Sequence, residues 1–235
     1  MTIWCERVIR CPGCGTAQTA QLARGANAGR DPHLRDEVLG RRLHRVACAC
    51  GLKIRIEATF EYLDIERGQL LLVGRADSLE SWPELEVQLR TIVRGALERG
   101  SPLLQPFVRD VRSRVVLGAE ALREKLVVWE AALDDALVEC IKLRAFAADP
   151  ALATPGSRLV VDAVGPDDAL TCWWSPHADA PPARRLELPP SWVRDAYRDR
   201  GSLEARFPEL FGGGFVDVRR FLSLAPPAGG GRSSH

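Results

Sequence analysis

The chain carries Cys11-Pro12-Gly13-Cys14-Gly15 near its beginning and Cys48-Ala49-Cys50-Gly51 after a long insert. Two closely spaced cysteines followed by glycine are typical of the turn with which a zinc ribbon presents two sulfur ligands to one ion. The glycine permits a positive φ and leaves backbone amides free to point at sulfur. Because Zn²⁺ prefers four soft ligands in a tetrahedron, the two segments predict a structural zinc site at Cys11, Cys14, Cys48 and Cys50.

The second cysteine pair is one residue shorter than the first, since only Ala49 separates Cys48 from Cys50. At this spacing the two sulfurs would leave an extended backbone rather than a closed turn, so either the turn is deformed or one sulfur is not a ligand. Cys5 is the alternative sulfur, because a strand over residues 4–10 would run beside the site. The remaining interpretation is that the cysteines are reduced and bind no metal, since free cysteine is a common small hydrophobic residue.

Composition sets wide bounds on what the protein is. At 235 residues, with 46% hydrophobic residues, the chain is long enough for one large domain or two small ones. Its net charge of +1 gives no bulk attraction to nucleic acid or membrane. Arginine greatly outnumbers lysine, which occurs only at Lys53, Lys125 and Lys142, and this bias is typical of a GC-rich bacterial genome.

The cysteine count and the hydropathy pattern indicate a cytoplasmic protein. Seven cysteines is an odd number, and Cys5, Cys140 and Cys172 have no paired spacing, so a secreted disulfide scaffold is not expected. No charged-then-apolar leader opens the chain, and no apolar run approaches the ~20 residues that a membrane span needs. We therefore expect a cytoplasmic location and no membrane partner.

The first part of the chain has the pattern of a small sheet. Alternation and turn residues predict strands over residues 4–10, 16–23, 43–47, 52–59, 60–65 and 70–73. Asp31-Pro32 has the form of a helix start, and the helix would continue to about residue 43. These elements predict a zinc-ribbon-like antiparallel sheet of four to six strands with a helical insert.

The middle of the chain is predicted to be helical and the last part mixed. Helices are expected over 81–99 and, without a break, over 119–147, with a strand over 108–117 between them. After a linker at 147–157, strands are expected over 159–164, 170–174 and 215–221, with a helix over 190–198. The whole is an α+β fold. Its predicted parts are residues 1–146, a small C-terminal α/β domain over 157–225, and a disordered tail over 226–235.

Several of these segments resemble a known family. The first cysteine motif, the helix start at Asp31-Pro32, the second cysteine pair and Phe60-Glu61-Tyr62-Leu63-Asp64 resemble the CpXC domain of bacterial and archaeal proteins. Leu122-Arg123-Glu124-Lys125-Leu126 and Leu133-Asp134-Asp135 resemble the segment that follows this domain. The resemblance covers about residues 5–146 and implies a zinc-ribbon-like fold whose function is uncharacterised. A second Cys-x-x-Cys is usual in the family, and Cys48-Ala49-Cys50 departs from it.

The sequence contains no recognisable catalytic motif, and we expect no enzyme. Four thiolates would fill the coordination shell of a zinc ion, whereas a catalytic site keeps a position open. His33 and His44 are the two histidines near enough in sequence to replace a sulfur. The acidic residues around Asp134-Asp135 and Glu139 are interpreted as a solvated helix face rather than a magnesium site. The glycines at 212–214 lack the lysine and serine of a nucleotide-binding loop.

The leading functional hypothesis is a non-catalytic, zinc-stabilised protein-interaction module that serves as adaptor or accessory subunit of a bacterial multi-protein system. Trp173 and Trp174 are the candidate contacts for an unidentified protein partner if they are exposed. The alternative is a zinc ribbon that binds nucleic acid through basic residues near the cysteines. The residues that suggest this alternative are Arg41, Arg42, Arg45, Lys53 and Arg55.

Overall fold

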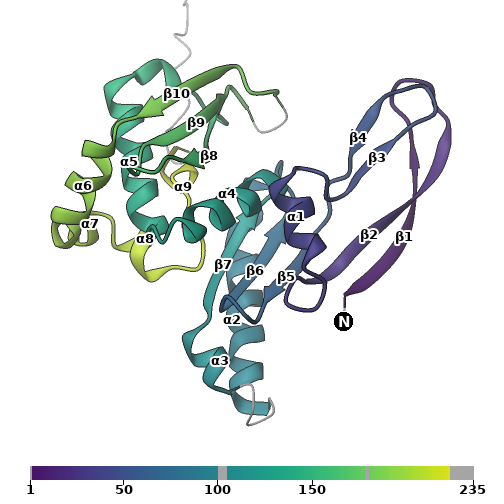
Figure 1. Ribbon diagram of the computed structural model, residues 1–235, viewed down its shortest axis with the longest axis horizontal. Coiled ribbons are helices and arrows are strands. Elements are labelled where there is room, and N and C mark those ends of the chain that lie inside the picture. Colours follow the sequence, from purple (N-terminus) through teal and green to yellow (C-terminus); the bar gives the residue numbers. More distant parts are fainter. Residues whose placement is uncertain (1, 100–104, 178–179, 223–235) are drawn as a thin grey trace, which may run out of the picture. The chain divides into compact units, whose positions relative to one another are not determined.

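The computed structural model describes residues 2–99, 105–177 and 180–222 (Figure 1). It divides the chain into two compact units, an N-terminal unit of Met1–Val127 with Gly213–Phe215 and a C-terminal unit of Val128–Gly212 with Val216–His235. The chain thus passes from one unit to the other within helix α4 (Ala119–Glu130), and not in the predicted linker at 147–157. The predicted tail at 226–235 lies outside the described residues. The mixed helix and strand content confirms the α+β class.

The N-terminal unit is built on one five-stranded sheet in the order β1-β2-β5-β6-β7. The strands are β1 (Ile3–Arg10), β2 (Ala17–Asn27), β5 (Phe60–Asp64), β6 (Gln69–Gly74) and β7 (Arg112–Leu117). β1 with β2 and β5 with β6 form antiparallel hairpins, as predicted, but β2 runs parallel to β5 and β6 runs parallel to β7. Each parallel pair follows a long connection that contains a helix, which is what a parallel crossover requires.

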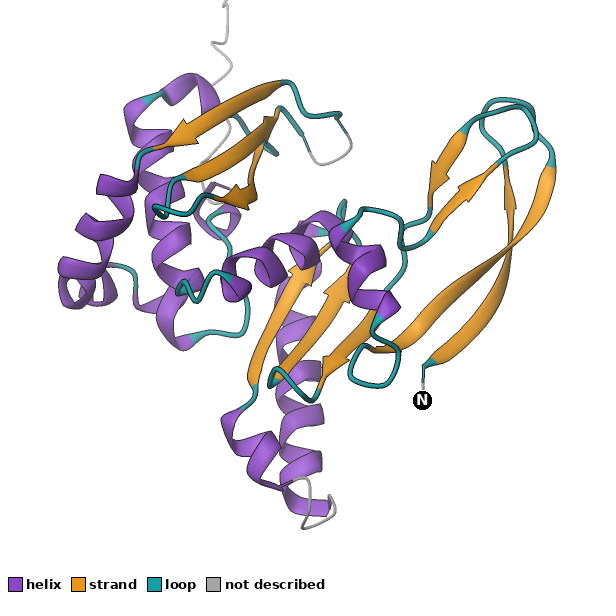
Figure 2. Cartoon of the chain, in the orientation of Figure 1, coloured by secondary structure: helices purple, strands orange, loops and turns teal. Residues whose placement is uncertain are grey.

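Helices cover both faces of this sheet (Figure 2). On one face α2 (Trp82–Arg99) packs on β6 and β7 through a core of Leu72, Leu89, Val115, Leu117 and Phe215. On the other face lie α1 (His33–Leu39) and the first turns of α4, and the Arg123 guanidinium donates a 2.8 Å hydrogen bond to the carbonyl of Leu39 between these two helices. The short helix α3 (Gln105–Asp110) leads into β7.

The strand predicted over residues 215–221 is wrong. The segment Gly213–Phe215 lies against β7, where the amide of Val115 donates a 2.9 Å hydrogen bond to the carbonyl of Gly214. The carboxylate of Glu86 on α2 accepts hydrogen bonds from the amides of Gly214 and Phe215. A single-turn helix, α9 (Arg219–Leu222), follows instead of a strand.

The C-terminal unit combines a three-stranded antiparallel sheet with helices (Figure 1). Its strand order is β10-β9-β8, and the hairpin predicted over 159–174 is present as β8 and β9. The strands are β8 (Arg158–Val164), β9 (Leu170–Ser175) and β10 (Arg184–Leu188), and the helices are α5 (Asp135–Ala148), α6 (Pro190–Arg198), α7 (Arg200–Arg206) and α8 (Pro208–Gly212). Among the helices of the described chain, none has the length and apolar character needed to cross a membrane.

The single helix predicted over 119–147 is two helices, α4 and α5. The chain turns between them at Ala132, whose φ is +57°, and Asp134 then starts α5 by accepting a 2.9 Å hydrogen bond from the amide of Ala136. The Asp134 carboxylate also bonds the Arg200 guanidinium at 2.7 Å. The apolar residues keep helical spacing on both sides of Asp134, and an aspartate can also stand inside a helix. The sequence pattern therefore contained no sign that a new helix begins there.

The solvated acidic face predicted for this helix is also wrong. Glu139 is buried, accepts a 2.9 Å hydrogen bond from the ammonium of Lys142 and a second of 2.9 Å from the amide of Val218. Glu124 and Asp135 are buried as well. Through its two hydrogen bonds Glu139 joins α5 to the segment before α9, and its buried charge is paired and hydrogen-bonded.

Candidate metal centre

The first cysteine pair lies at the tip of the β1–β2 hairpin. The hairpin is closed by a 2.9 Å hydrogen bond from the amide of Cys11 to the carbonyl of Thr16. Within the turn, the amide of Gly15 donates a 2.8 Å bond to the carbonyl of Cys11, and Gly15 has a φ of +73°. The glycine thus takes the left-handed conformation that the sequence predicted for it.

The second cysteine pair lies at the tip of a separate two-stranded hairpin, β3 (Arg45–Ala47) with β4 (Lys53–Arg55). Here the amide of Cys48 donates to the carbonyl of Leu52 at 2.8 Å, and the amide of Gly51 donates to the carbonyl of Cys48 at 2.9 Å. Gly51 has a φ of +89°. The shorter spacing therefore gives a tighter closed turn, with its bond spanning three residues instead of four, and the extended backbone that we expected for Cys-x-Cys is wrong.

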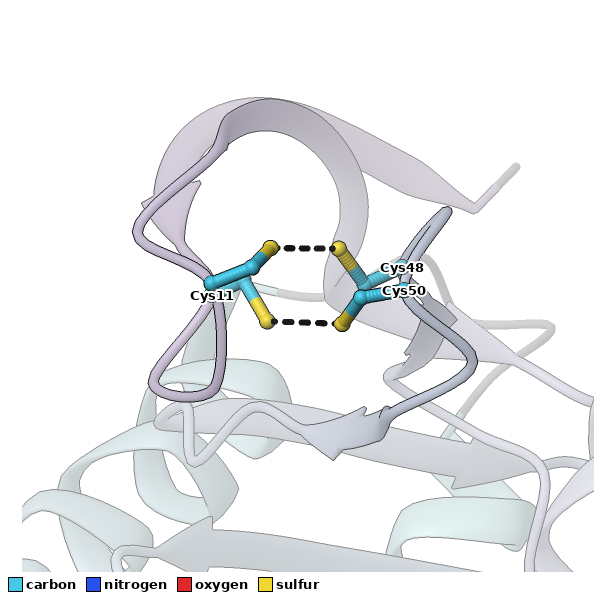
Figure 3. Close-up of side chains that lie close together, drawn as sticks. Cys11, Cys48 and Cys50 are labelled. Atoms are coloured by element: carbon cyan, nitrogen blue, oxygen red, sulfur yellow. Dashed lines mark hydrogen bonds between the residues drawn. The ribbon is translucent and has the colours of Figure 1, made fainter.

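The two tips bring the four sulfurs together (Figure 3). The Sγ atoms of Cys11 and Cys50 are 3.6 Å apart, those of Cys14 and Cys48 are 3.5 Å apart, and all four lie within 4.8 Å of one another. A tetrahedral ion with metal–sulfur bonds of about 2.3 Å has sulfur–sulfur edges of about 3.8 Å. The four side chains thus fit a tetrahedral metal ion. Among the described residues, they are the group of cysteine, histidine and acidic side chains found close enough together to hold one.

Apolar packing holds the two hairpins side by side. Ala20 and Leu22 of β2 pack against Ile56, and partly buried side chains of both hairpins surround them: Cys5, Ile9, Val46, Ile54 and Ala58. Cys5 is therefore part of this apolar cluster and does not belong to the four-sulfur group. This small core fixes the strands of both hairpins. Because each tip extends directly from those strands, the core also sets the position of the two tips.

Neither histidine replaces a sulfur. The Nε2 atom of His44 accepts a 2.9 Å hydrogen bond from the amide of Ala23, and its ring contacts Phe60 edge-on with 4.9 Å between centroids. Burial lowers the pKa of His44 to about 4, so the imidazole is neutral at physiological pH. His33 is exposed on α1 and is not part of the cluster.

The four thiols differ in exposure and acidity. Cys11 and Cys48 are buried, whereas Cys14 and Cys50 are exposed. Hydrogen bonding with the hydroxyl and the backbone of Thr16 lowers the pKa of Cys14 to about 6. The Cys50 amide lowers the pKa of Cys48, but the adjacent Cys14 sulfur and burial outweigh it and raise that pKa to about 12. A bound cation would displace the proton from every thiol, so metal binding releases protons.

Two contacts of the centre were not predicted from the sequence. The Thr16 hydroxyl lies 3.3 Å from the Cys14 sulfur, and Leu52 covers the first turn so closely that a Cβ on Gly13 would lie 3.3 Å from its Cδ2 atom. The sequence offered one indication of both contacts: Thr16 and Leu52 each directly follow a Cys-Gly pair. The contact of Thr16 with Cys14 is local to the first turn, whereas the contact of Leu52 with Gly13 depends on how the two tips face each other, which no single-hairpin pattern contains.

The tryptophans proposed as a partner contact have structural partners. The Trp173 indole donates a 3.2 Å hydrogen bond to Asp162, and the Trp174 indole donates a 2.8 Å bond to the carbonyl of Leu152. Both side chains are half-buried, and as neighbours on β9 they point to opposite faces of the sheet. They therefore do not form one exposed patch.

The basic residues near the centre are partly neutralised. Arg41 and Arg55 both pair with the carboxylate of Glu120 on α4, at 2.9 Å for Arg41. Burial alone would raise the pKa of Glu120, but the charges and hydrogen bonds of the two arginines outweigh it and lower the pKa. The carboxylate is therefore ionised. Arg45 and Lys53 remain exposed on the β3–β4 hairpin.

Comparison with known proteins identifies one family. The family model described as CpXC protein matches residues 9–142, from β1 into α5. No curated protein matches the chain, and no solved structure does. The family match includes both cysteine pairs and more than half of the 235 residues. This chain belongs to the CpXC protein family.

Proposed function

We propose that the protein is a non-catalytic interaction module stabilised by a structural zinc ion, and that it acts as adaptor or accessory subunit in a bacterial multi-protein system. Zinc is the metal favoured by the donor set, because four cysteine sulfurs at tetrahedral spacing are typical of structural zinc sites. Four sulfur ligands leave no coordination position for water or substrate, which supports a structural rather than a catalytic role.

The observation that carries the interaction role is the apolar edge of strand β1. This strand forms one end of the five-stranded sheet, and in the described residues it pairs with β2 on one side only. Its side chains Ile3, Trp4 and Val8 are 60%, 44% and 70% exposed. Trp4 and Val8 lie on the same face of the strand, since they are an even number of residues apart. The opposite end of the sheet, by contrast, has the Gly213–Phe215 segment against it.

An edge of this kind is suited to a partner that adds a strand. Its unpaired backbone groups would bond an extended segment of the partner, while Trp4 and Val8 would contact the partner's side chains. The strand runs directly into the first cysteine turn at Cys11, so a metal ion that fixes the two tips also fixes the end of β1. Metal binding and partner binding are therefore coupled in this proposal.

A photo-crosslinking amino acid in place of Val8 tests the proposal in the native host. The matched control replaces Val87, a valine that is 55% exposed on α2. We expect a protein adduct at position 8, absent at position 87 and absent when Cys14→Ser removes a metal ligand. Equal labelling at both positions, or none at position 8, would contradict the interaction role of β1.

The second candidate is nucleic-acid binding, which the exposed Arg45 and Lys53 beside the second cysteine pair favour. Arg41 and Arg55 share the single carboxylate of Glu120, which offsets one of the five positive charges in this group. Retention on heparin at low salt that is lost in Lys53→Glu would support this candidate over the first. Passage through the column without delay would eliminate it.

A further inference from the structure

The C-terminal unit contains a pocket that is unrelated to the metal centre. It has a volume of about 350 Å³, within the usual range for small-molecule sites, and lies between α5 and the pair α6–α7. Its lining residues are Cys140, Ile141, Leu143, Arg144, Ala147, Trp192, Asp195, Ala196, Asp199, Leu203, Arg206 and Phe207. Most of them follow residue 142, where the family match ends.

Apart from four charged residues, the lining of the pocket is apolar. The lining includes the aliphatic side chains of Ile141, Leu143 and Leu203, together with the indole of Trp192 and the ring of Phe207. The one thiol in the wall, Cys140, is buried, and this burial, with the nearby Glu139 and Asp134 carboxylates, raises its pKa to about 11. The thiol is therefore neutral at physiological pH, and the wall suits the hydrocarbon part of a ligand.

Two carboxylates at the rim of the pocket are already paired. Asp195 bonds Arg144 at 3.2 Å and Arg198 at 2.6 Å, and these hydrogen bonds lower its pKa. Asp199 lies 3.4 Å from the same Arg198. The Arg144 guanidinium also stacks 4.4 Å over the ring of Trp192, which fixes it against the wall. These four charged groups compensate one another, so none of them is left to attract a ligand.

Arg206 is the remaining charged residue of the lining. Its guanidinium stacks 5.2 Å over the ring of Phe207. Among the residues that the structure describes, it pairs with no carboxylate, and its side chain is exposed at the end of α7. The pocket thus combines an apolar cavity with one uncompensated positive charge that is held in place by an aromatic ring.

We propose that this pocket binds a small amphipathic carboxylate, with its aliphatic or aromatic body among the apolar side chains and its carboxylate on the Arg206 guanidinium. A guanidinium and a carboxylate form paired, charge-assisted hydrogen bonds, which fixes the orientation of the ligand. An amphipathic amine would be repelled by Arg206. A neutral alcohol of the same length would gain only the apolar contacts.

Isothermal titration of the full chain with decanoate, decanol and decylamine tests the proposal. We expect one decanoate per chain, bound roughly tenfold or more tightly than decanol because of the charged hydrogen bonds, and no binding of decylamine. Arg206→Gln should bring decanoate down to the affinity of decanol. The control Arg194→Gln, an exposed arginine of α6 outside the lining, should change nothing.

A second variant tests whether the ligand occupies this space. Ala147 is exposed at the pocket, so Ala147→Trp fills part of the cavity without disturbing the core, and it should weaken decanoate and decanol equally. Far-ultraviolet circular dichroism checks that each variant is folded. Equal affinity for decanoate and decanol, unchanged binding in Arg206→Gln, or no heat from any ligand at millimolar concentration would overturn the proposal.

Discussion

The carbonyl of Cys48 accepts a 2.9 Å hydrogen bond from the amide of Gly51, and this bond closes the second cysteine turn one residue earlier than in the first turn. The bond depends on the φ of +89° at Gly51, a conformation that costs other residues about 1–2 kcal/mol. The one-residue deletion relative to Cys-x-x-Cys is thereby absorbed in the turn, and both sulfurs still reach the cluster.

Gly51→Ala should therefore lower the free energy of unfolding of the metal-loaded protein by about 1 kcal/mol. A Cβ at Gly51 meets nothing within 4 Å, so the loss measures backbone strain alone. Urea denaturation measures it. The control is Gly201→Ala in α7, which also has open space but no positive φ and should be neutral or slightly stabilising. Equal effects of the two substitutions would contradict this account of the turn.

Cys14 should be the most reactive thiol of the metal-free protein. Its pKa of about 6 makes it a thiolate at neutral pH, and it is exposed. Its alkylation by iodoacetamide, followed by peptide mass spectrometry, should rise with a midpoint near pH 6. Thr16→Val removes the hydroxyl at 3.3 Å and should move this midpoint to higher pH, while alkylation of Cys50 is unchanged. A wild-type midpoint between 8 and 9, the ordinary range for cysteine, would refute the role of Thr16.

His44 should make the stability of the protein sensitive to acid. Because burial lowers its pKa from 6.5 to about 4, the unfolded chain binds a proton between these values that the folded protein does not. The contribution of His44 to stability is present above pH 6.5 and is lost as the pH falls toward 4. Between pH 7 and pH 5 the loss from this residue is about 2 kcal/mol.

The variant His44→Gln isolates this loss from that of the thiols. A glutamine can accept the hydrogen bond from the amide of Ala23 without titrating in this range. We expect the difference in unfolding free energy between wild type and variant to shrink by about 2 kcal/mol on going from pH 7 to pH 5 in excess metal. A difference that stays constant with pH would show that His44 is not the source.

The two cysteine turns and their flanking strands could be predicted from the sequence, because neighbouring residues determine each of them. The cysteine and glycine positions, with alternation that is regular only after the second pair, predict strands on both sides of each cysteine turn, and the structure contains both hairpins. What joins the hairpins is not local. The apolar contacts of Leu22 with Ile56, and the cover of Leu52 on Gly13, involve residues more than thirty positions apart and leave no pattern in either strand.

The errors outside the centre have related physical causes. The parallel pairing of β2 with β5 depends on the crossover that α1 completes, whereas the strand pattern is the same for either direction. The break before α5 is fixed by Asp134 and its Arg200 partner, far along the chain. The burial of Glu139 depends on Lys142 and on the amide of Val218, so its charge alone suggested a solvated side chain.

In our proposal four cysteine sulfurs bind one structural zinc ion. Elemental analysis with native mass spectrometry, on protein purified without a metal-binding tag, tests this most directly. We predict about one zinc per chain in the wild type and in the control Cys5→Ser, and loss of zinc in Cys14→Ser and Cys50→Ser. Less than about a tenth of a zinc per folded chain, or full zinc in Cys50→Ser, would contradict the claim.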